Sequence, residues 1–191
     1  MSGRHLSGVA LLLDREVPEG YLRQSTETVA ASLPVTETNF TSVVVFRIGS
    51  EWLALPTAVI KEIGERSTVH HLPHRGGLVE GIISVRGEVL VLVALEVLLG
   101  LQMLRRESSS AAQALKQRLI VCENDGSRVA FVASDVYGVH RYLPRDLRHI
   151  PATVERAAAA YSIGILPWKD GETIGCLDAG LVFYSINKGL A

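Results

Sequence analysis

The stretch GIISVRGEVLVLV, residues 81–93, carries the clearest structural signal in this chain of 191 residues. Two runs rich in apolar and β-branched residues, 81–85 and 89–93, are joined by the tripeptide Arg86–Glu88. β-Branched side chains favour strands, and the glycine between the runs can adopt the positive φ that a tight reversal needs. The stretch therefore predicts a β-hairpin with Arg86 near its tip. Because both runs are almost continuously apolar, we expect both of their faces to be covered.

Hairpins of the same kind are predicted on both sides of this stretch, since short apolar runs again flank clusters of turn residues. The paired runs are 43–48 with 52–55, 118–122 with 129–133, and 162–168 with 173–177. Two further strands are expected, at residues 68–72 and 136–143.

Helices are expected to be few and short. Pro56 predicts a helix that runs through Ile63, with Ile60 and Ile63 on one face, because the missing N–H of proline is tolerated in a first helical turn. A second short helix is expected at residues 95–99, where a glycine follows. The periodicity of residues 181–186 fits a closing helix or a strand and does not decide between them.

Together these elements amount to about nine or ten short strands at regular spacing, which predicts an all-β architecture. Residues 1–39 are interpreted as a leader that holds a short amphipathic helix and a linker. Residues 40–190 are expected to form one domain. Its first half, 40–103, is separated from its second half, 118–190, by a polar loop at 104–117. One small barrel per half would explain the position of this loop.

Composition narrows the possible function classes. Hydrophobic residues make up 48% of the chain and charged residues 20%, which predicts a packed core rather than disorder. The formal net charge is −1 and the basic residues are spread out, which argues against nucleic acid as the partner.

The sequence also indicates the compartment. Val9–Leu13 is followed by charged residues rather than a cleavage site, and no window approaches the ~18 apolar residues of a membrane span. Cys122 and Cys176 lie far apart in apolar runs, which predicts two buried thiols rather than a disulfide. These features fit a reducing cytoplasm.

The sequence contains no motif of a catalytic or cofactor site, whether a phosphate-binding glycine loop or a nucleophile elbow. His70, His71 and His74 are the best metal candidates, but neighbouring residues of a strand point to opposite faces, so no metal site is predicted. Asp135 and Asp178 border apolar runs, where a turn or capping role is the ordinary explanation. The sequence therefore predicts a binding protein without a cofactor rather than an enzyme.

Arg86 is the residue whose chemistry leaves two roles open. A planar guanidinium displayed on a rigid turn can form bidentate contacts with a carboxylate or with backbone carbonyls of a partner. A solvated turn arginine or an internal salt bridge explains the same position equally well. A small barrel that binds RNA or another ligand is the alternative function, since such barrels often bind nucleic acid.

An ordered series of short motifs resembles the CheW family over residues 40–188. In chain order the motifs are Phe46-x-Ile48-Gly49, Leu53–Pro56, Ile60-x-Glu62-Ile63, Leu72-Pro73, Gly81–Gly87, Leu98–Leu101, Arg118–Val121 and Val129–Val132. The resemblance implies an all-β fold in which two small five-stranded SH3-like barrels with short helices pack together. It also implies a cytoplasmic protein without catalytic activity.

Members of this family bridge the cytoplasmic tips of chemoreceptors and the regulatory domain of a CheA-type histidine kinase, and they meet the membrane only through the receptors. By resemblance, Val85, Arg86 and Gly87 fall on the family's Val-Arg-Gly hairpin, whose Arg-Gly pair is implicated in receptor coupling. Ile60 and Glu62 fall on a segment tied to the apolar groove for a receptor helix. These five residues are the expected receptor- and kinase-binding site.

Two features set this chain apart from the family pattern. Val91, Ala94 and Ser134 stand where the family often has Pro, Asp and Asp, which keeps the hydrophobic pattern and changes the expected contacts with partners. The leader, from Leu12 through Tyr21, resembles the stretch before the domain in adaptors of Wsp-like surface-sensing pathways. Those pathways end in a diguanylate cyclase.

Overall fold

The computed structural model describes residues 39–66, 68–72, 77–101, 117–150 and 156–190. The chain divides into two units after residue 38, and all described residues belong to the unit that begins at Asn39. The amphipathic helix expected in the leader therefore lies outside the described residues. So does the expected polar loop, apart from Gln117.

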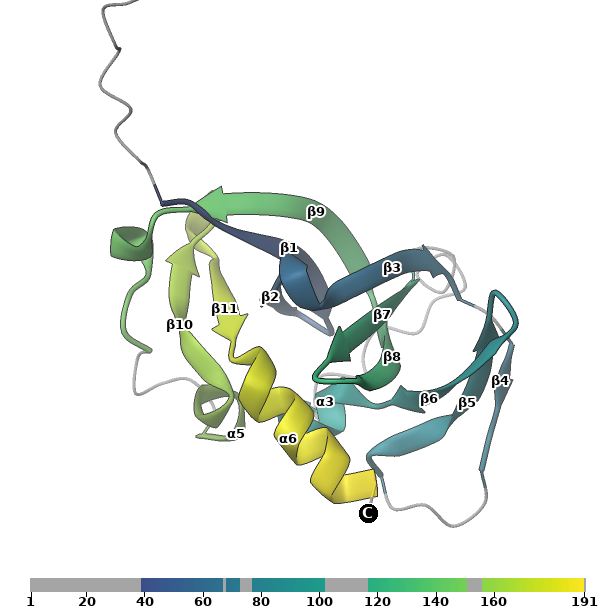
Figure 1. The fold of residues 1–191 in the computed structure, drawn as a ribbon. Helices are drawn as coiled ribbons and strands as arrows, with labels where there is room; N and C mark the ends of the chain where they lie inside the picture. Colours follow the sequence, from purple (N-terminus) through teal and green to yellow (C-terminus); the bar gives the residue numbers. More distant parts are fainter. Residues whose placement is uncertain (1–38, 67, 73–76, 102–116, 151–155, 191) are drawn as a thin grey trace, which may run out of the picture. The chain divides into compact units, whose positions relative to one another are not determined.

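Five strands form the first sheet, in the order β10-β11-β2-β1-β9 (Figure 1). Neighbouring strands are antiparallel except for β11 and β2, which are parallel. The bounds are Thr41–Ile48 for β1, Glu51–Pro56 for β2, Asp135–Tyr142 for β9, Ser162–Pro167 for β10 and Thr173–Leu177 for β11.

Six strands form the second sheet, in the order β3-β7-β8-β6-β5-β4. Here the parallel pair is β6 with β8. The bounds are Ile60–Glu65 for β3, Val69–His70 for β4, Val79–Val85 for β5, Glu88–Val93 for β6, Arg118–Asn124 for β7 and Ser127–Ala133 for β8.

The expectation of one barrel for each half of the sequence is wrong, because each sheet contains strands from both halves. Strands β9, β10 and β11 join β1 and β2, while β7 and β8 join β3 to β6. The predicted hairpins do form, but a hairpin satisfies only one edge of each of its strands. The open edges of β2 and β6 are filled by β11 and β8, far along the chain.

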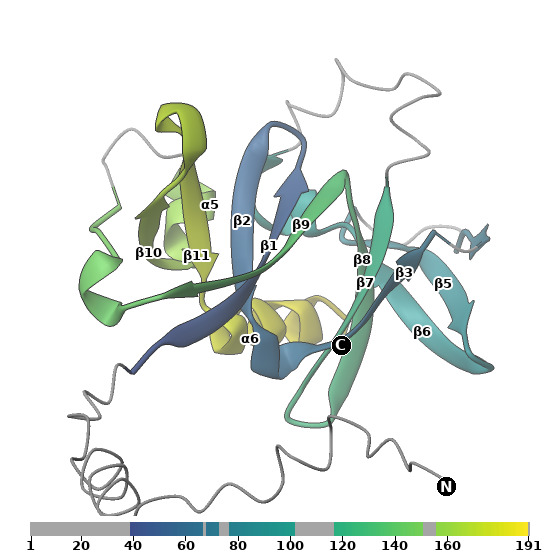
Figure 2. The ribbon, with the colours of Figure 1, turned by 90° about the horizontal axis from the view of Figure 1, so that it is seen from above.

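The largest hydrophobic core lies between the two sheets. Phe46 of β1 and Phe131 of β8 meet there, with ring centroids 5.1 Å apart, and Phe183 of the last helix packs into the same cluster. Figures 1 and 2 show this helix crossing beside the junction of the two sheets. Two smaller cores lie within the sheets, one around Val45 and Ile174 and the other around Ile83, Leu92 and Val121.

The prediction that both faces of the β5–β6 hairpin are covered is wrong. The strands that are buried on both faces are those that lie between two cores. Residues 119–122 of β7 are all buried, alternating between the small core of their sheet and the large one. In the hairpin, Val89 is 67% exposed and Ser84 is exposed as well. The hairpin lies on the side of the second sheet away from the first (Figure 1), and none of the described helices and strands forms a layer over its outer face.

The closing segment is a helix, α6 (Ala179–Leu190), which settles the choice that periodicity left open. Asp178 caps it, because its Oδ1 accepts a hydrogen bond of 3.0 Å from the backbone N–H of Leu181. The face of the helix with Val182, Phe183 and Ile186 enters the large core. The predicted capping role of Asp178 is therefore confirmed.

The helix predicted from Pro56 through Ile63 is wrong. A single 3-10 turn, η1 (Thr57–Val59), follows Pro56, and strand β3 begins at Ile60. The edge of β7 provides pairing for this segment, and tertiary pairing overrides a weak local preference. The remaining short elements are α3 (Leu95–Leu98), η3 (Pro144–Asp146), α5 (Arg156–Ala160) and η4 (Lys169–Gly171).

The two cysteines are buried and free, as predicted. Burial raises the pKa of the Cys122 thiol to about 12 and that of Cys176 to about 11. Both are therefore protonated small hydrophobic groups at neutral pH. Within the described part of the chain, no helix has both the length and the apolar character to cross a bilayer.

Candidate functional site

The hairpin between β5 and β6 turns on two residues, Arg86 and Gly87. Val85 pairs with Glu88 across the turn, and φ is 51° at Arg86 and 85° at Gly87. Positive φ at both central residues is the pattern of a type I′ turn, whose twist matches that of the flanking strands. Glycine takes this conformation freely, whereas an arginine there is strained by about 1 kcal/mol.

The side chain of Arg86 forms one ion pair and otherwise faces solvent. Its Nε lies 3.0 Å from Oε1 of Glu62, and 81% of the arginine side chain is exposed compared with 23% of the glutamate. The contact uses Nε alone, so the terminal nitrogens of the guanidinium remain accessible to a partner. Of the two roles that the sequence left open for Arg86, the internal salt bridge is present. It leaves the terminal nitrogens able to contact a partner, so the two roles are compatible.

A β-bulge at Lys61 aims Glu62 at the hairpin. Ile60 pairs with Cys122 and Glu62 pairs with Val121, so Lys61 is an extra residue in β3. Cys122 and Val121 point to opposite faces, and their partners do so too. Ile60 therefore packs against the large core, and Glu62 lies on the face of the small core of the second sheet. Bulges commonly re-aim a side chain in this way.

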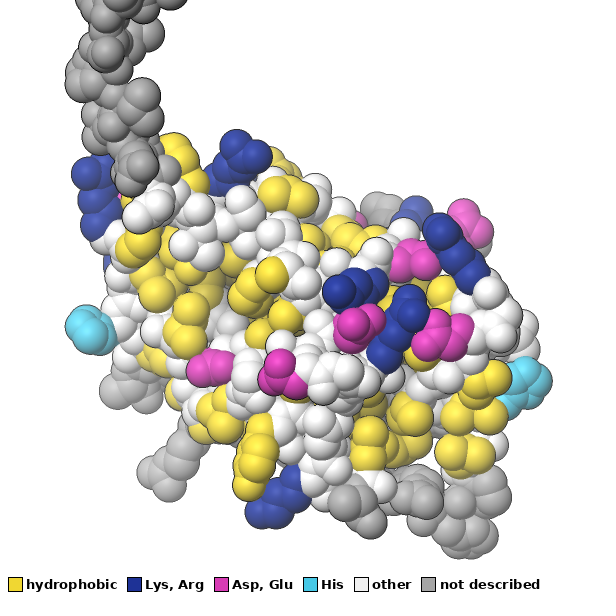
Figure 3. All heavy atoms as spheres, in the orientation of Figure 1, with side chains coloured by type: hydrophobic (Ala, Val, Ile, Leu, Met, Phe, Trp, Pro, Cys, Tyr) yellow, Lys and Arg dark blue, Asp and Glu magenta, His cyan; other side chains and the backbone are white. Residues whose placement is uncertain are grey.

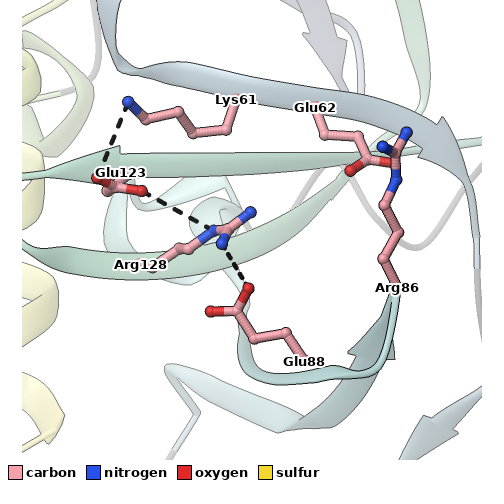
Figure 4. A network of polar contacts seen from close by, with 6 residues as sticks. All are labelled: Lys61, Glu62, Arg86, Glu88, Glu123 and Arg128. Carbon is pink, nitrogen blue, oxygen red and sulfur yellow. Dashed lines mark hydrogen bonds and ion pairs between the residues drawn. The ribbon is translucent and has the colours of Figure 1, made fainter.

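Further ion pairs hold the hairpin on the β6 side of its turn (Figure 4). Arg128 of β8 contacts the carboxylate of Glu88, the first residue of β6. Its Nε also lies 4.0 Å from Oε2 of Glu123, whose Oε1 is 3.8 Å from Nζ of Lys61. Figure 3 shows acidic and basic side chains interspersed in this region. The turn of the hairpin is thus held on its two sides, by Glu62 through Arg86 and by Arg128 through Glu88.

A cleft of mixed polarity lies on the other side of β3. Ile63 is 40% exposed and, with Val136 of β9, lines this cleft of about 400 Å³, whose other side chains are those of Glu65, Arg118 and Asp135. Ile63 pairs with Ile120, which belongs to the large core between the sheets. Strand β3 therefore presents Glu62 toward the hairpin and Ile63 toward this cleft.

The predicted site residues do not form one surface. Glu62 and Arg86 are brought together, and Gly87 shapes the turn. Ile60 packs against the large core and Val85 against the small core of the second sheet, so both have a structural role. Several residues of the site could not be predicted from the sequence because their roles depend on strands that pair from distant parts of the chain; these are Lys61, Ile63, Glu88, Glu123 and Arg128.

The histidines provide no metal centre among the residues that the structure describes. His70 is exposed on β4, and His71 Nδ1 lies 3.0 Å from the backbone oxygen of Glu80. His74 lies outside the described residues. No group of three or more His, Cys, Asp or Glu side chains in the described ranges could hold an ion. What the site offers is charge and exposed apolar surface, which are properties of a contact surface.

The family model for the CheW-like domain matches residues 42–187. The chain belongs to the CheW-like family. Among solved structures, this CheW-like chain is similar to the crystal structure of the scaffolding protein TtCheW from Thermoanaerobacter tengcongensis. The TM-score is 0.61 at 20% sequence identity, and the match covers 75% of this chain and 87% of that one. A search of curated protein sequences finds no match. The predicted all-β, CheW-like fold is confirmed.

Proposed function

We propose that this protein is a non-catalytic adaptor that couples chemoreceptors to a CheA-type histidine kinase. The observation that carries the proposal is the placement of Arg86. It occupies a strained turn, is 81% exposed, and is oriented by a carboxylate that a bulge aims at it. Strain at an exposed position is a feature of functional sites, because stability alone would favour another residue there.

The receptor is proposed to bind along β3. A helical hairpin from the receptor tip would place apolar side chains against Ile63 and Val136, in the manner of helix-in-groove recognition. Arg86 would then contact a carboxylate or a helix C-terminus of the receptor through its free terminal nitrogens. Val89, 67% exposed on the outer face of the same hairpin, would add apolar area.

The kinase contact is proposed from family membership, as the regulatory domain of CheA-type kinases resembles this fold. The protein would then work in the cytoplasm at membrane-bound receptor arrays. The leader supports a narrower proposal, because residues 12–21 resemble adaptors of Wsp-like pathways. In that case the output is a diguanylate cyclase rather than a flagellar switch.

Binding measurements with purified components test the adaptor function. The full chain is titrated with a receptor tip fragment and, separately, with a kinase regulatory domain from the same organism. We expect dissociation constants at or below tens of micromolar, roughly −6 to −8 kcal/mol, for both. Failure to bind either component would reject the proposal. Binding of the kinase domain alone would therefore also reject it, because an adaptor must hold both components.

A further inference from the structure

The arginines of this protein differ in whether they have acidic partners. Arg47 and Arg86 each lie within 4.0 Å of a carboxylate, and Arg128 has two such neighbours. Arg141, Arg145 and Arg148 lie at one end of the first sheet and have no carboxylate within this distance among the described residues. All three are exposed. Unpaired like charges repel one another when they are gathered in one place, so their grouping requires an explanation.

These three arginines line a single cleft of about 400 Å³. The cleft lies between β9 and β10, the two edge strands of the first sheet. Leu166 and Pro167 of β10 form its apolar side. It remains open because β9 and β10 do not pair with each other along their described residues.

Residues 143–148, which follow β9, are held by hydrogen bonds to β10 and within their own turn, which fixes the backbone at Arg145 and Arg148. The backbone of Arg148 exchanges hydrogen bonds of 2.8 and 2.9 Å with Ile165 of β10. The turn η3 is closed by Asp146, whose Oδ2 accepts a bond of 3.0 Å from the backbone N–H of Leu143. The one carboxylate that lines the cleft is therefore engaged with the backbone rather than with a guanidinium.

We propose that this cleft binds a small phosphorylated ligand with at least two phosphate groups. The planar guanidinium matches the oxygens of a phosphate in a bidentate way, and three of them in one cleft suit more than one phosphate. The volume is in the range of small-molecule sites. Tyr142, which belongs to β9 and lines the cleft, is only 5% exposed and therefore provides little ring surface as an anchor for a protein partner.

Titration of the full chain with inorganic pyrophosphate and with ADP tests this proposal. Trp168, whose ring lies 5.4 Å from that of His140 in the cleft wall, provides a fluorescence signal. We expect saturable binding of one or both with a dissociation constant below about 1 mM, weakening as salt is added. Tighter binding of ADP would identify a nucleotide ligand, and equal binding would identify the phosphates alone.

Variants distinguish specific binding of pyrophosphate in the cleft from non-specific electrostatic attraction to the protein. The double variant Arg145→Gln, Arg148→Gln should bind pyrophosphate at least about tenfold more weakly, with an unchanged circular-dichroism spectrum, because neither side chain has a described partner to lose. Lys188→Gln, which removes an exposed cation from α6, should bind as the parent does. Absence of saturable binding, or an equal loss in Lys188→Gln, would overturn the proposal. So would a glutamate-rich peptide that binds the cleft more tightly than pyrophosphate, because the cleft would then be a protein-docking surface.

Discussion

Two hairpins of the second sheet have the same turn geometry and opposite turn chemistry. The β7–β8 hairpin turns on Asp125 and Gly126, with φ of 48° and 78°, and the β5–β6 hairpin turns on Arg86 and Gly87, with φ of 51° and 85°. Because β6 and β8 are parallel, both tips lie at the same end of the sheet. Asp-Gly is among the favoured sequences for a type I′ turn, whereas arginine is not.

We interpret the Asp125-Gly126 turn as one that favours folding and the Arg86-Gly87 turn as one that contacts a partner. The three described non-glycine residues with positive φ are Arg86, Asp125 and Asp170, and aspartate tolerates this conformation far better than arginine does. An exposed ion pair with Glu62 offsets the strain of Arg86 only in part. The β5–β6 turn is thus less stable than its sequence could make it, which is expected where the side chain has a partner outside the chain.

The largest expected effect comes from reversing the charge at the contact turn. Arg86→Glu should weaken receptor-tip binding at least about tenfold, about 1.4 kcal/mol, because it removes the guanidinium and places a second carboxylate beside Glu62. Titration calorimetry with the receptor fragment measures the loss, and circular dichroism checks folding. Asp125→Glu, in the other turn, is the control and should bind normally. Unfolding of Arg86→Glu would show that Arg86 is structural.

Substitution of the two turn glycines should have equal effects on stability and different effects on receptor binding. A Cβ at Gly87 or Gly126 would meet no atom within 4 Å, so alanine at either position is strained only by its positive φ. Each substitution should lower the free energy of unfolding by about 1 kcal/mol, as measured by urea denaturation. Only Gly87→Ala should also weaken receptor binding. A loss of binding in Gly126→Ala would contradict the assignment of contact to the β5–β6 turn.

A smaller effect is expected at Glu88, the residue that follows the contact turn. Arg128→Gln removes the cation that holds Glu88 and should weaken receptor binding about threefold, since the tip is then less well positioned. The same binding assay measures it. Lys61→Gln removes a more distant member of the network, 3.8 Å from Glu123, and should have less effect. If the two variants are equally impaired, general charge matters rather than the position of the hairpin.

The smallest effect is a gain in stability. Arg86→Asn relieves about 1 kcal/mol of strain and removes an exposed ion pair that contributes about 0.5 kcal/mol, so the variant should be about 0.5 kcal/mol more stable. The opposite exchange, Asp125→Arg, should lower stability by a similar amount. Urea midpoints of the two variants check both signs. A destabilised Arg86→Asn would mean that the ion pair with Glu62 outweighs the strain.

Local sequence was sufficient for the hairpins because a turn is a local event. The turn at Arg86-Gly87 and the turn at Asp125-Gly126 each lie between apolar runs a few residues long. It was not sufficient for β3, where Pro56 and the spacing of Ile60 and Ile63 predicted a helix. That segment is a strand because the edge of β7, encoded far along the chain, provides its hydrogen bonds.

The candidate site shows the same division. The sequence indicated Arg86 and Glu62 separately, one as a displayed cation and the other by family resemblance, but not the bulge at Lys61 that turns Glu62 toward Arg86. A bulge is a mismatch between two strands, so it cannot be read from one of them. Arg128 was missed for a similar reason, because its contact with Glu88 requires the parallel pairing of β6 and β8.

The β-rich class, the positions of the hairpins, the burial of the two cysteines and the family of the domain could all be predicted from the order of the residues. Each of these follows from the order and spacing of residues close together in the chain. The folded chain was needed to show which hairpins share a sheet, which face of β3 carries Glu62, and which arginines have no carboxylate nearby among the described residues. Those features depend on pairing between strands distant in sequence, where many combinations satisfy the same local pattern and the packing of the shared core selects one.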